Sequence, residues 1–300
     1  MIGEGPMSRR LPFFVLGLGV LVISFGAILA RLAQEGGLPS LAIAALRLGI
    51  AALVVTPLAW GQSRTELQSL TRRQLALAAG AGFFLALHFA AWISSLETTS
   101  VASSTAMVTT NPVWIALASF AFFGERTSRL TLAGIVVSLA GSLMIFWSDA
   151  SAETGGRAAL LGCALALAGS WCFSAYLLIG RRLRAGMPLT AYIWLAYGMA
   201  ALFLLAGCGI AGVPLSGYRL PAYLAALGMA LGPQLLGHTA YNWSLRHVST
   251  TFVGVVTLGE PVGSAFLAWC LFGEAFAPLQ AAGFVLSLAG VYLAARGEAR

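Results

Sequence analysis

The chain has 300 residues, of which 59% are hydrophobic and only 9% are charged. Because soluble domains carry about 25% charged residues, this composition excludes an ordinary soluble protein and predicts an all-α membrane protein embedded in the lipid bilayer. The formal net charge is +7, but the arginines are scattered through short segments, so we expect no nucleic-acid partner.

Apolar stretches recur along the chain, separated by short breaks of turn residues and charges. A stretch of about 20 apolar residues is long enough to cross a bilayer as one helix. The sequence predicts ten transmembrane helices, near residues 11–33, 39–60, 74–96, 101–123, 130–147, 158–180, 188–208, 222–245, 251–272 and 279–296. The first stretch is too long for a typical signal-peptide core, and we interpret it as a retained helix.

Ten helices place both termini on one side of the membrane, and the arginines indicate which side. If the amino terminus is inside, the inner segments hold Arg9, Arg10, Arg64, Arg72, Arg73, Arg126, Arg129, Arg181, Arg182, Arg184, Arg246, Arg296 and Arg300. The outer segments then hold only Arg31, Arg157 and Arg219. Because basic residues concentrate in cytoplasmic loops, both termini are predicted to be cytoplasmic.

The second half of the chain repeats the first at an offset of 149 residues, without a gap. This offset places Pro112 on Pro261, Phe123-Gly124-Glu125 on Phe272-Gly273-Glu274, and Ser138-Leu139-Ala140-Gly141 on Ser287-Leu288-Ala289-Gly290. Each half holds five helices, and an odd number means that the second copy enters the membrane inverted. The sequence therefore predicts two inverted five-helix repeats, residues 1–148 and 149–300, an arrangement common among secondary transporters.

Two predicted helices carry a polar residue and a proline in the middle of an apolar stretch. These are Asn111-Pro112 and Glu260-Pro261. Proline frees the carbonyl four residues earlier, and a charge at the bilayer centre costs roughly 2.5–3.5 kcal/mol on insertion scales. Such groups belong inside the protein or on a water-filled cavity. We predict that Asn111 and Glu260 line a midplane substrate cavity; the alternative is that Glu260 only braces helix packing.

A second charge, Arg47, lies within the predicted helix 39–60. One hypothesis pairs it with Glu260, or lets Arg47 hold a substrate carboxylate while Glu260 holds the amine. In the alternative, the long side chain reaches the outer surface beside Glu35 or Glu97.

Two helices carry a stripe of polar and aromatic residues on one face. His88 and Trp92 are four residues apart in the third predicted helix, and Gln234, His238 and Tyr241 share a face of the eighth. We predict that these stripes line the substrate cavity, although a seam of hydrogen bonds between helices would show the same spacing.

Aromatic residues of the sixth predicted helix supply further candidates. Trp171 and Tyr176 are predicted to form aromatic cavity walls, which suit stacking on a ring or contact with an ammonium group. Some aromatic residues should instead form the belt at the membrane interface, for which Trp60, Trp147 and Tyr218 are better candidates.

The last helix of each half carries small residues at regular spacing. They are Gly134, Ser138 and Gly141 in the fifth helix and Gly283, Ser287 and Gly290 in the tenth. Small residues let helix backbones approach closely. We interpret both helices as packing or dimerising struts, so the protein is expected to be a monomer or a homodimer formed through them.

These motifs resemble those of the drug/metabolite transporter superfamily, in its ten-helix EamA-type branch. The resemblance covers nearly the whole chain and rests on Asn111-Pro112-Val113 with Phe123-Gly124-Glu125-Arg126, and Gly259-Glu260-Pro261 with Phe272-Gly273-Glu274. It implies a bacterial inner-membrane exporter of amino acids or similar small metabolites that works by alternating access, like the aromatic-amino-acid exporters of the YddG type. The alternative within transport is a proton-coupled exporter of drugs or hydrophobic cations.

Sequence motifs of other functional classes are missing. The three histidines are well separated, no G-x-S-x-G or P-loop occurs, and the four cysteines form no C-x-x-C pair. Glu260 has no acidic neighbour in the predicted helices, as paired-carboxylate catalysis would need. We therefore expect no enzymatic activity, no cofactor, no metal and no drive by ATP.

Overall fold

The computed structural model describes residues 10–152, 156–273 and 277–298, and all regular elements in these ranges are helices. Ten spans are long and apolar enough to cross a membrane by length and composition, which confirms the predicted number of helices. They are Leu11–Glu35, Ser40–Gln62, Arg72–Ser95, Val101–Phe123, Arg129–Ser148, Arg157–Arg184, Leu189–Ala211, Leu220–Ser244, Thr250–Leu271 and Pro278–Glu298. The predictions that involve Arg9, Glu274 and Arg300 lie outside the described residues.

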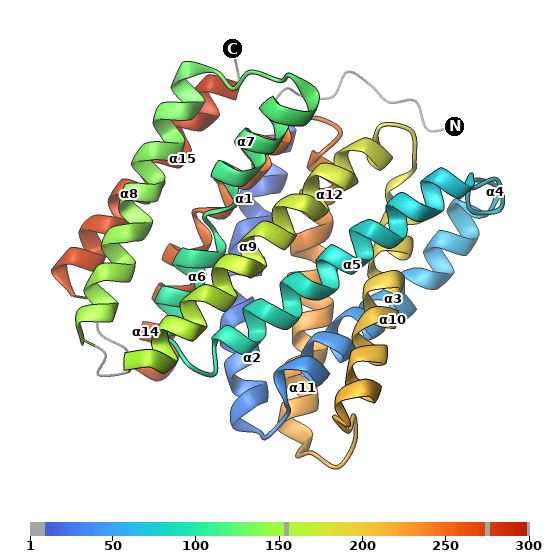
Figure 1. The fold of residues 1–300 in the computed structure, drawn as a ribbon, viewed down its shortest axis with the longest axis horizontal. Helices are drawn as coiled ribbons and strands as arrows, with labels where there is room; N and C mark the ends of the chain where they lie inside the picture. The colour runs from blue at the N-terminus through green and yellow to red at the C-terminus, as the bar shows by residue number, and fades with distance from the viewer. Residues whose placement is uncertain (1–9, 153–155, 274–276, 299–300) are drawn as a thin grey trace.

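Several spans consist of two or three successive helices (Figure 1). The first half contains α1 (Leu11–Ile23), α2 (Phe25–Glu35), α3 (Ser40–Gln62), the short α4 (Arg64–Gln68), α5 (Arg72–Ser95), α6 (Val101–Val108), α7 (Asn111–Phe123) and α8 (Arg129–Ala152). The second half contains α9 (Gly156–Arg184), α10 (Leu189–Ala211), α11 (Leu220–Met229), the π-helix η1 (Ala230–His238), α12 (Thr239–Ser244), α13 (Thr250–Thr257), α14 (Glu260–Phe272) and α15 (Pro278–Glu298).

The fourth and ninth spans break at equivalent points. α6 ends at Val108 and α7 begins at Asn111, while α13 ends at Thr257 and α14 begins at Glu260. Each pair of boundaries differs by the repeat offset of 149 residues. Each second helix has its proline in the first turn, where the missing N–H is tolerated and the proline ring suits helical geometry.

The beginnings and ends of these two spans are also built alike. The side chains of Ser100 and Ser249 accept hydrogen bonds from the backbone N–H groups of Ser103 and Phe252, each at 3.0 Å, and so cap α6 and α13. Gly124 and Gly273 end α7 and α14 with φ of 65° and 70°, a left-handed conformation that favours glycine. The repeat seen in the sequence therefore corresponds to a repeat of start and stop signals.

Two interruptions have no counterpart in the other half. The first span breaks at Ser24, whose hydroxyl donates to the carbonyl of Val20 at 2.9 Å. The eighth span becomes π-helical around Pro233, which lacks the N–H of a regular helix. Neither break was predicted from the sequence, and both lie beside the centre of the bundle.

The last helices of the two halves, α8 and α15, lie side by side at one edge of the molecule (Figure 1). Ser138 Oγ donates to the carbonyl of Ser287 at 3.0 Å, and Ser287 Oγ donates back to the carbonyl of Ser138 at 3.2 Å. A Cβ on Gly134 would lie 2.6 Å from the carbonyl oxygen of Gly290, so these backbones touch. The small-residue faces thus pack against each other within one chain.

Candidate functional site

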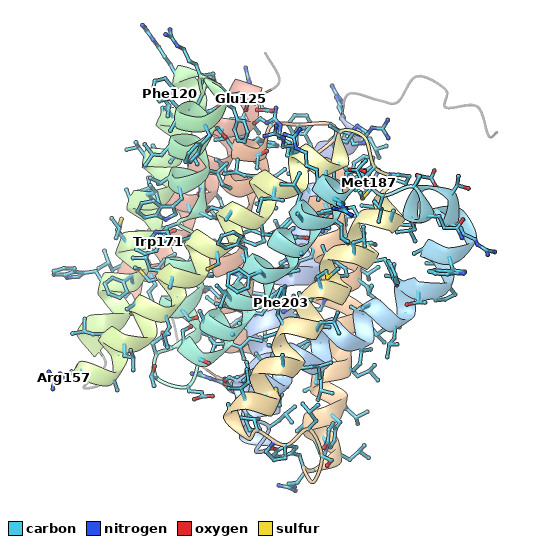
Figure 2. The ribbon with its side chains drawn as sticks, turned by 45° about the vertical axis from the view of Figure 1, so that its right-hand side comes forward. Phe120, Glu125, Arg157, Trp171, Met187 and Phe203 are labelled. Atoms are coloured by element: carbon cyan, nitrogen blue, oxygen red, sulfur yellow. The ribbon has the colours of Figure 1, made fainter. Side chains whose placement is uncertain are left out.

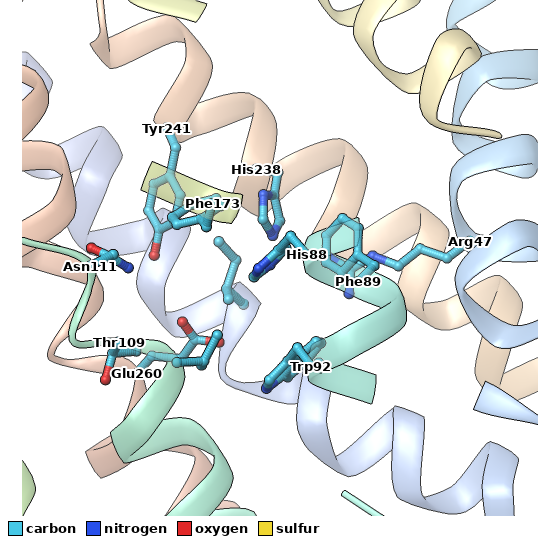
Figure 3. A pocket seen from close by; sticks show the side chains of 13 residues that line it. Arg47, His88, Phe89, Trp92, Thr109, Asn111, Phe173, His238, Tyr241 and Glu260 are labelled. Atoms are coloured by element: carbon cyan, nitrogen blue, oxygen red, sulfur yellow. The ribbon is translucent and has the colours of Figure 1, made fainter. Parts of the chain in front are cut away.

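A small cavity lies at the centre of the bundle, where the broken spans meet α3, α5 and α9 (Figure 3). Its lining residues are Ile23, Gly26, Arg47, His88, Phe89, Trp92, Val108, Thr109, Asn111, Phe173, His238, Tyr241 and Glu260. Its volume of about 20 Å³ is enough for little more than one water molecule. The structure therefore shows the centre in a closed conformation.

Arg47 reaches this centre from α3 and is only 1% exposed, so it does not extend to the outer surface. Its Nε donates to Oε1 of Gln234 at 2.8 Å, and its guanidinium carbon lies 3.9 Å from the centroid of the Phe89 ring. Both terminal nitrogens, Nη1 and Nη2, are buried and have no hydrogen-bond partner in the described part of the chain. Arg47 is thus held through Nε, while Nη1 and Nη2 donate to no group in the described part of the chain.

Glu260 stands in the first turn of α14 and is 8% exposed. Within residues 10–152, 156–273 and 277–298, no group forms a hydrogen bond or an ion pair with its carboxylate. The ion pair with Arg47, raised above as one hypothesis, is not formed in this conformation. Figure 3 shows the rings of His88 and Trp92 in the region between the two charged side chains.

Asn111, the counterpart of Glu260 in the first half, is fully engaged by protein. Its Nδ2 donates to Oγ1 of Thr257 at 3.1 Å, and the Oδ1 of Asn111 lies 3.3 Å from the same hydroxyl. Its backbone carbonyl accepts from Oγ of Ser174 at 3.3 Å. Asn111 therefore ties the break before α7 to α13 and α9.

Aromatic rings from three spans form one wall of the cavity. The ring centroid of His88 lies 4.6 Å from that of Phe89, 4.8 Å from that of Phe173 and 6.3 Å from that of His238. Tyr241 continues this wall, 5.8 Å from His238. The Nδ1 of His88 lies 2.9 Å from the carbonyl of Gly169, and because a carbonyl only accepts, this nitrogen carries a hydrogen.

Several buried polar atoms around the centre have no partner in the described residues. Besides the two nitrogens of Arg47, they are Trp92 Nε1, Gln234 Nε2, His238 Nδ1 and the Tyr241 hydroxyl. A buried donor or acceptor without a partner costs about 1–3 kcal/mol, and native proteins contain few of them. Their concentration at one cavity, together with the free carboxylate of Glu260, is typical of a binding site for a polar ligand.

Some of the predicted site residues lie away from this cavity. Trp171 is 51% exposed on the outward face of α9, with its ring centroid 5.5 Å from that of Trp114 (Figure 2). Tyr176 is buried, and its hydroxyl donates to Oδ1 of Asn242 at 2.8 Å. Gln234 acts through its bond to Arg47. On a helix, Trp171 and the cavity residue Phe173 are about 200° apart, because each residue turns about 100°.

The sequence did not identify the remaining lining residues, which are Ile23, Gly26, Phe89, Val108, Thr109 and Phe173. Four of them, Ile23, Gly26, Val108 and Thr109, lie within two residues of a helix break. Proximity to a break is therefore the signal that could have found them. Phe89 and Phe173 offer no such signal, since a phenylalanine suits lipid and cavity equally.

Comparison with known proteins gives concordant results. A model of the EamA-like transporter family matches residues 11–147 and again residues 160–296. An uncharacterized transporter of Clostridium kluyveri is 26% identical over 86% of this chain and 84% of its own length. A probable amino-acid metabolite efflux pump of Salmonella typhimurium is 26% identical over 60% of this chain and 62% of its own. The fold is also similar to that of a chain in a solved crystal structure, with a TM-score of 0.77 at 21% identity, covering 96% of this chain and 97% of that chain.

Proposed function

Because the chain belongs to the EamA-like transporter family, we propose that it exports amino acids or closely related small metabolites by alternating access around the central cavity. The observation that carries the proposal is the pair of buried charges with unused bonding capacity, Arg47 and Glu260, on one cavity. An amino acid carries a carboxylate and an ammonium group, and so offers one partner to each. The name of the Salmonella typhimurium relative, an amino-acid metabolite efflux pump, supports the same substrate class.

In the proposed complex, the substrate carboxylate bonds to the two terminal nitrogens of Arg47. A guanidinium group can hold a carboxylate by two parallel bonds, and Gln234 already fixes its third nitrogen. The ammonium group lies at Glu260, and the substrate side chain lies against the rings of His88, Phe173 and Tyr241. Trp92 and His238 complete the site, and Asn111 lines the cavity while its side chain stays bonded to Thr257.

A substrate of this size does not fit the closed centre, so binding requires the helices to separate. The breaks before α7 and α14 divide two spans near their middle, which makes them the expected hinges. We propose that the two halves, residues 1–148 and 149–300, rock about the cavity and open it to each side in turn.

The excess of arginines on one side supports an inner-membrane orientation with both termini in the cytoplasm. Arg181, in the last turn of α9, forms a 3.1 Å ion pair with Glu125, which follows the end of α7. Both residues belong to segments that the proposal places in the cytoplasm. A homodimer through α8 and α15 would have to use their outward faces, because their glycines already face each other.

The unpaired carboxylate of Glu260 also favours a second candidate, a proton-coupled exporter of hydrophobic cations. Aromatic rings attract cations, and the wall formed by His88, Phe173 and Tyr241 would suit such a substrate. In this mechanism Glu260 binds either a proton or the cation, and exchanges one for the other.

Counterflow in proteoliposomes distinguishes the two candidates. Vesicles containing the protein are preloaded with one amino acid or one aromatic cation at a time, and uptake of the same labelled compound is measured with and without a pH gradient. Amino-acid flux without a gradient supports the first candidate, whereas gradient-driven flux of an aromatic cation supports the second. If neither class of compound moves while the purified protein is folded, both proposals are wrong.

A further inference from the structure

A second hollow opens on the outside of the bundle, between α5, α7 and α9. This α7–α9 groove is lined by Leu77, Trp114, Ala118, Phe122, Phe123, Trp171, Ser174, Ala175, Leu178, Ile179 and Arg182. Its volume is about 440 Å³, much larger than that of the central cavity. Figure 2 shows Trp171 on this outer face.

The groove lies at membrane depth, because its lining residues belong to membrane-spanning helices. Phe122 is 80% exposed and Trp171 is 51% exposed, so the groove is open to whatever surrounds the helices. Apart from Ser174 and Arg182, the residues that line the groove are apolar or aromatic. At this depth the surrounding molecules are lipids, and a hydrocarbon chain matches the lining.

One end of the groove carries a free cation. Arg182 is exposed, and no described residue forms a hydrogen bond or an ion pair with it. Its neighbour Arg181 is instead engaged with Glu125 at 3.1 Å. An apolar groove that ends in an unpaired guanidinium group is complementary to an amphiphile with an anionic head.

The length of the groove corresponds to one leaflet of the bilayer. Trp171 and Arg182 are eleven residues apart on α9, which is about 16 Å along the helix axis. Half of a hydrocarbon core of about 30 Å is about 15 Å. A lipid with its phosphate at Arg182 would therefore reach the level of Trp171 with its chain.

The equivalent point of the second half is closely packed, which shows that the groove is not a general feature of the repeat. The counterpart of Trp114 is Gly263, and a Cβ there would lie 2.1 Å from Oγ of Ser24. Trp114 instead lines the groove, with its ring packed edge-on against that of Trp171 at a centroid distance of 5.5 Å.

We propose that the α7–α9 groove binds one anionic phospholipid from the leaflet on the Arg182 side, with its phosphate at Arg182 and a chain beside Trp114 and Trp171. Ser174, one of the residues that line the groove, donates to the carbonyl of Asn111 at 3.3 Å. The bound chain thus packs behind the break that precedes α7, and supports α7 against α9.

Quenching of tryptophan fluorescence by brominated lipids tests this proposal directly. The protein is reconstituted into vesicles containing either brominated phosphatidylglycerol or brominated phosphatidylcholine. The contribution of the groove is the signal lost in Trp171→Phe. We expect this signal to be quenched at about fivefold lower mole fraction of the anionic lipid, as expected for one basic side chain near the surface.

Arg182→Gln should abolish the preference for the anionic lipid, whereas the matched variant Arg126→Gln should retain it. Arg126 is exposed on the same side of the membrane and does not line the groove. Ala175→Leu, which fills the groove, should reduce quenching by both lipids. Equal quenching by the two lipids in the unmodified protein, or an equal loss of preference in both arginine variants, would overturn the proposal.

Discussion

The fourth and ninth spans break at equivalent positions but use their polar residues differently. At the first break, Asn111 is bonded to Thr257 across the interface between the halves. The repeat offset pairs Asn111 with Glu260 and Thr257 with Val108. The contact equivalent to Asn111–Thr257 would therefore join Glu260 to Val108. Valine has no hydroxyl, and Glu260 has no partner among the described residues. The polar side chain at the first break is therefore bonded within the protein, whereas the carboxylate at the second break has no such bond in the described part of the chain.

This difference shows that two copies of one backbone feature can differ in their local bonding. The backbone supplies two equivalent breaks, and Val108 offers Glu260 no hydroxyl where Thr257 offers one to Asn111. The predictions below test the contrast between Asn111 and Glu260, beginning with the largest expected effect.

Glu260→Gln should weaken substrate binding by about 30-fold, because losing one partner of a buried charged pair costs about 2 kcal/mol or more. The change should be measured by titrating transported compounds into purified protein. Glu66→Gln, an equivalent change at an exposed site on α4, should leave binding unaltered. Unchanged affinity in Glu260→Gln would mean that this carboxylate does not contact the substrate.

Val108→Thr should restore the missing hydroxyl opposite Glu260. The new hydrogen bond to a charged group is worth about 1.5 kcal/mol, so substrate binding should weaken by roughly tenfold as the carboxylate becomes occupied. Val136→Thr, on the lipid-facing side of α8 and 66% exposed, is the control. An equal effect of both substitutions would argue against the proposed asymmetry.

Thr257→Val should act on stability rather than on binding. It leaves the buried amide of Asn111 without its partner, which should lower the free energy of unfolding by about 1 kcal/mol. Thermal unfolding in detergent measures this loss, and Thr65→Val in exposed α4 controls for the loss of a hydroxyl. A large loss of substrate affinity at unchanged stability would reverse the roles assigned to the two breaks.

Ser174→Ala should have the smallest effect, about 0.5 kcal/mol of unfolding free energy. Its single hydroxyl hydrogen is shared between the carbonyl of Ser170 at 2.8 Å and that of Asn111 at 3.3 Å, so the longer bond to Asn111 is the weaker of the two. Because Ser174 and Thr257 both hold Asn111, their combined variant should lose a different amount from the sum of the two single losses. Strict additivity would show that the two contacts are independent.

The sequence predicted the fold well because membrane spans, prolines and glycine caps are local signals. The offset between Pro112 and Pro261 predicted equivalent positions for the two prolines, but not that each span divides there into two helices. The candidate site was harder to predict, because an apolar side chain suits the lipid and the protein interior equally. Phe173 faces the cavity and Trp171 faces the membrane, yet composition does not separate them. The orientation of the Arg47 side chain depends on its hydrogen bond to Gln234. This bond joins two helices that are distant in the sequence, so no local pattern predicts it.

The mutual serine bonds between α8 and α15 have a consequence for the history of this architecture. A contact in which Ser138 holds Ser287 and Ser287 holds Ser138 is self-complementary, as in a symmetric dimer. A five-helix ancestor with this edge could already have assembled with an upside-down copy of itself. Joining two such genes end to end would then have freed each copy to change alone, so that equivalent positions can now hold an amide, Asn111, and an acid, Glu260.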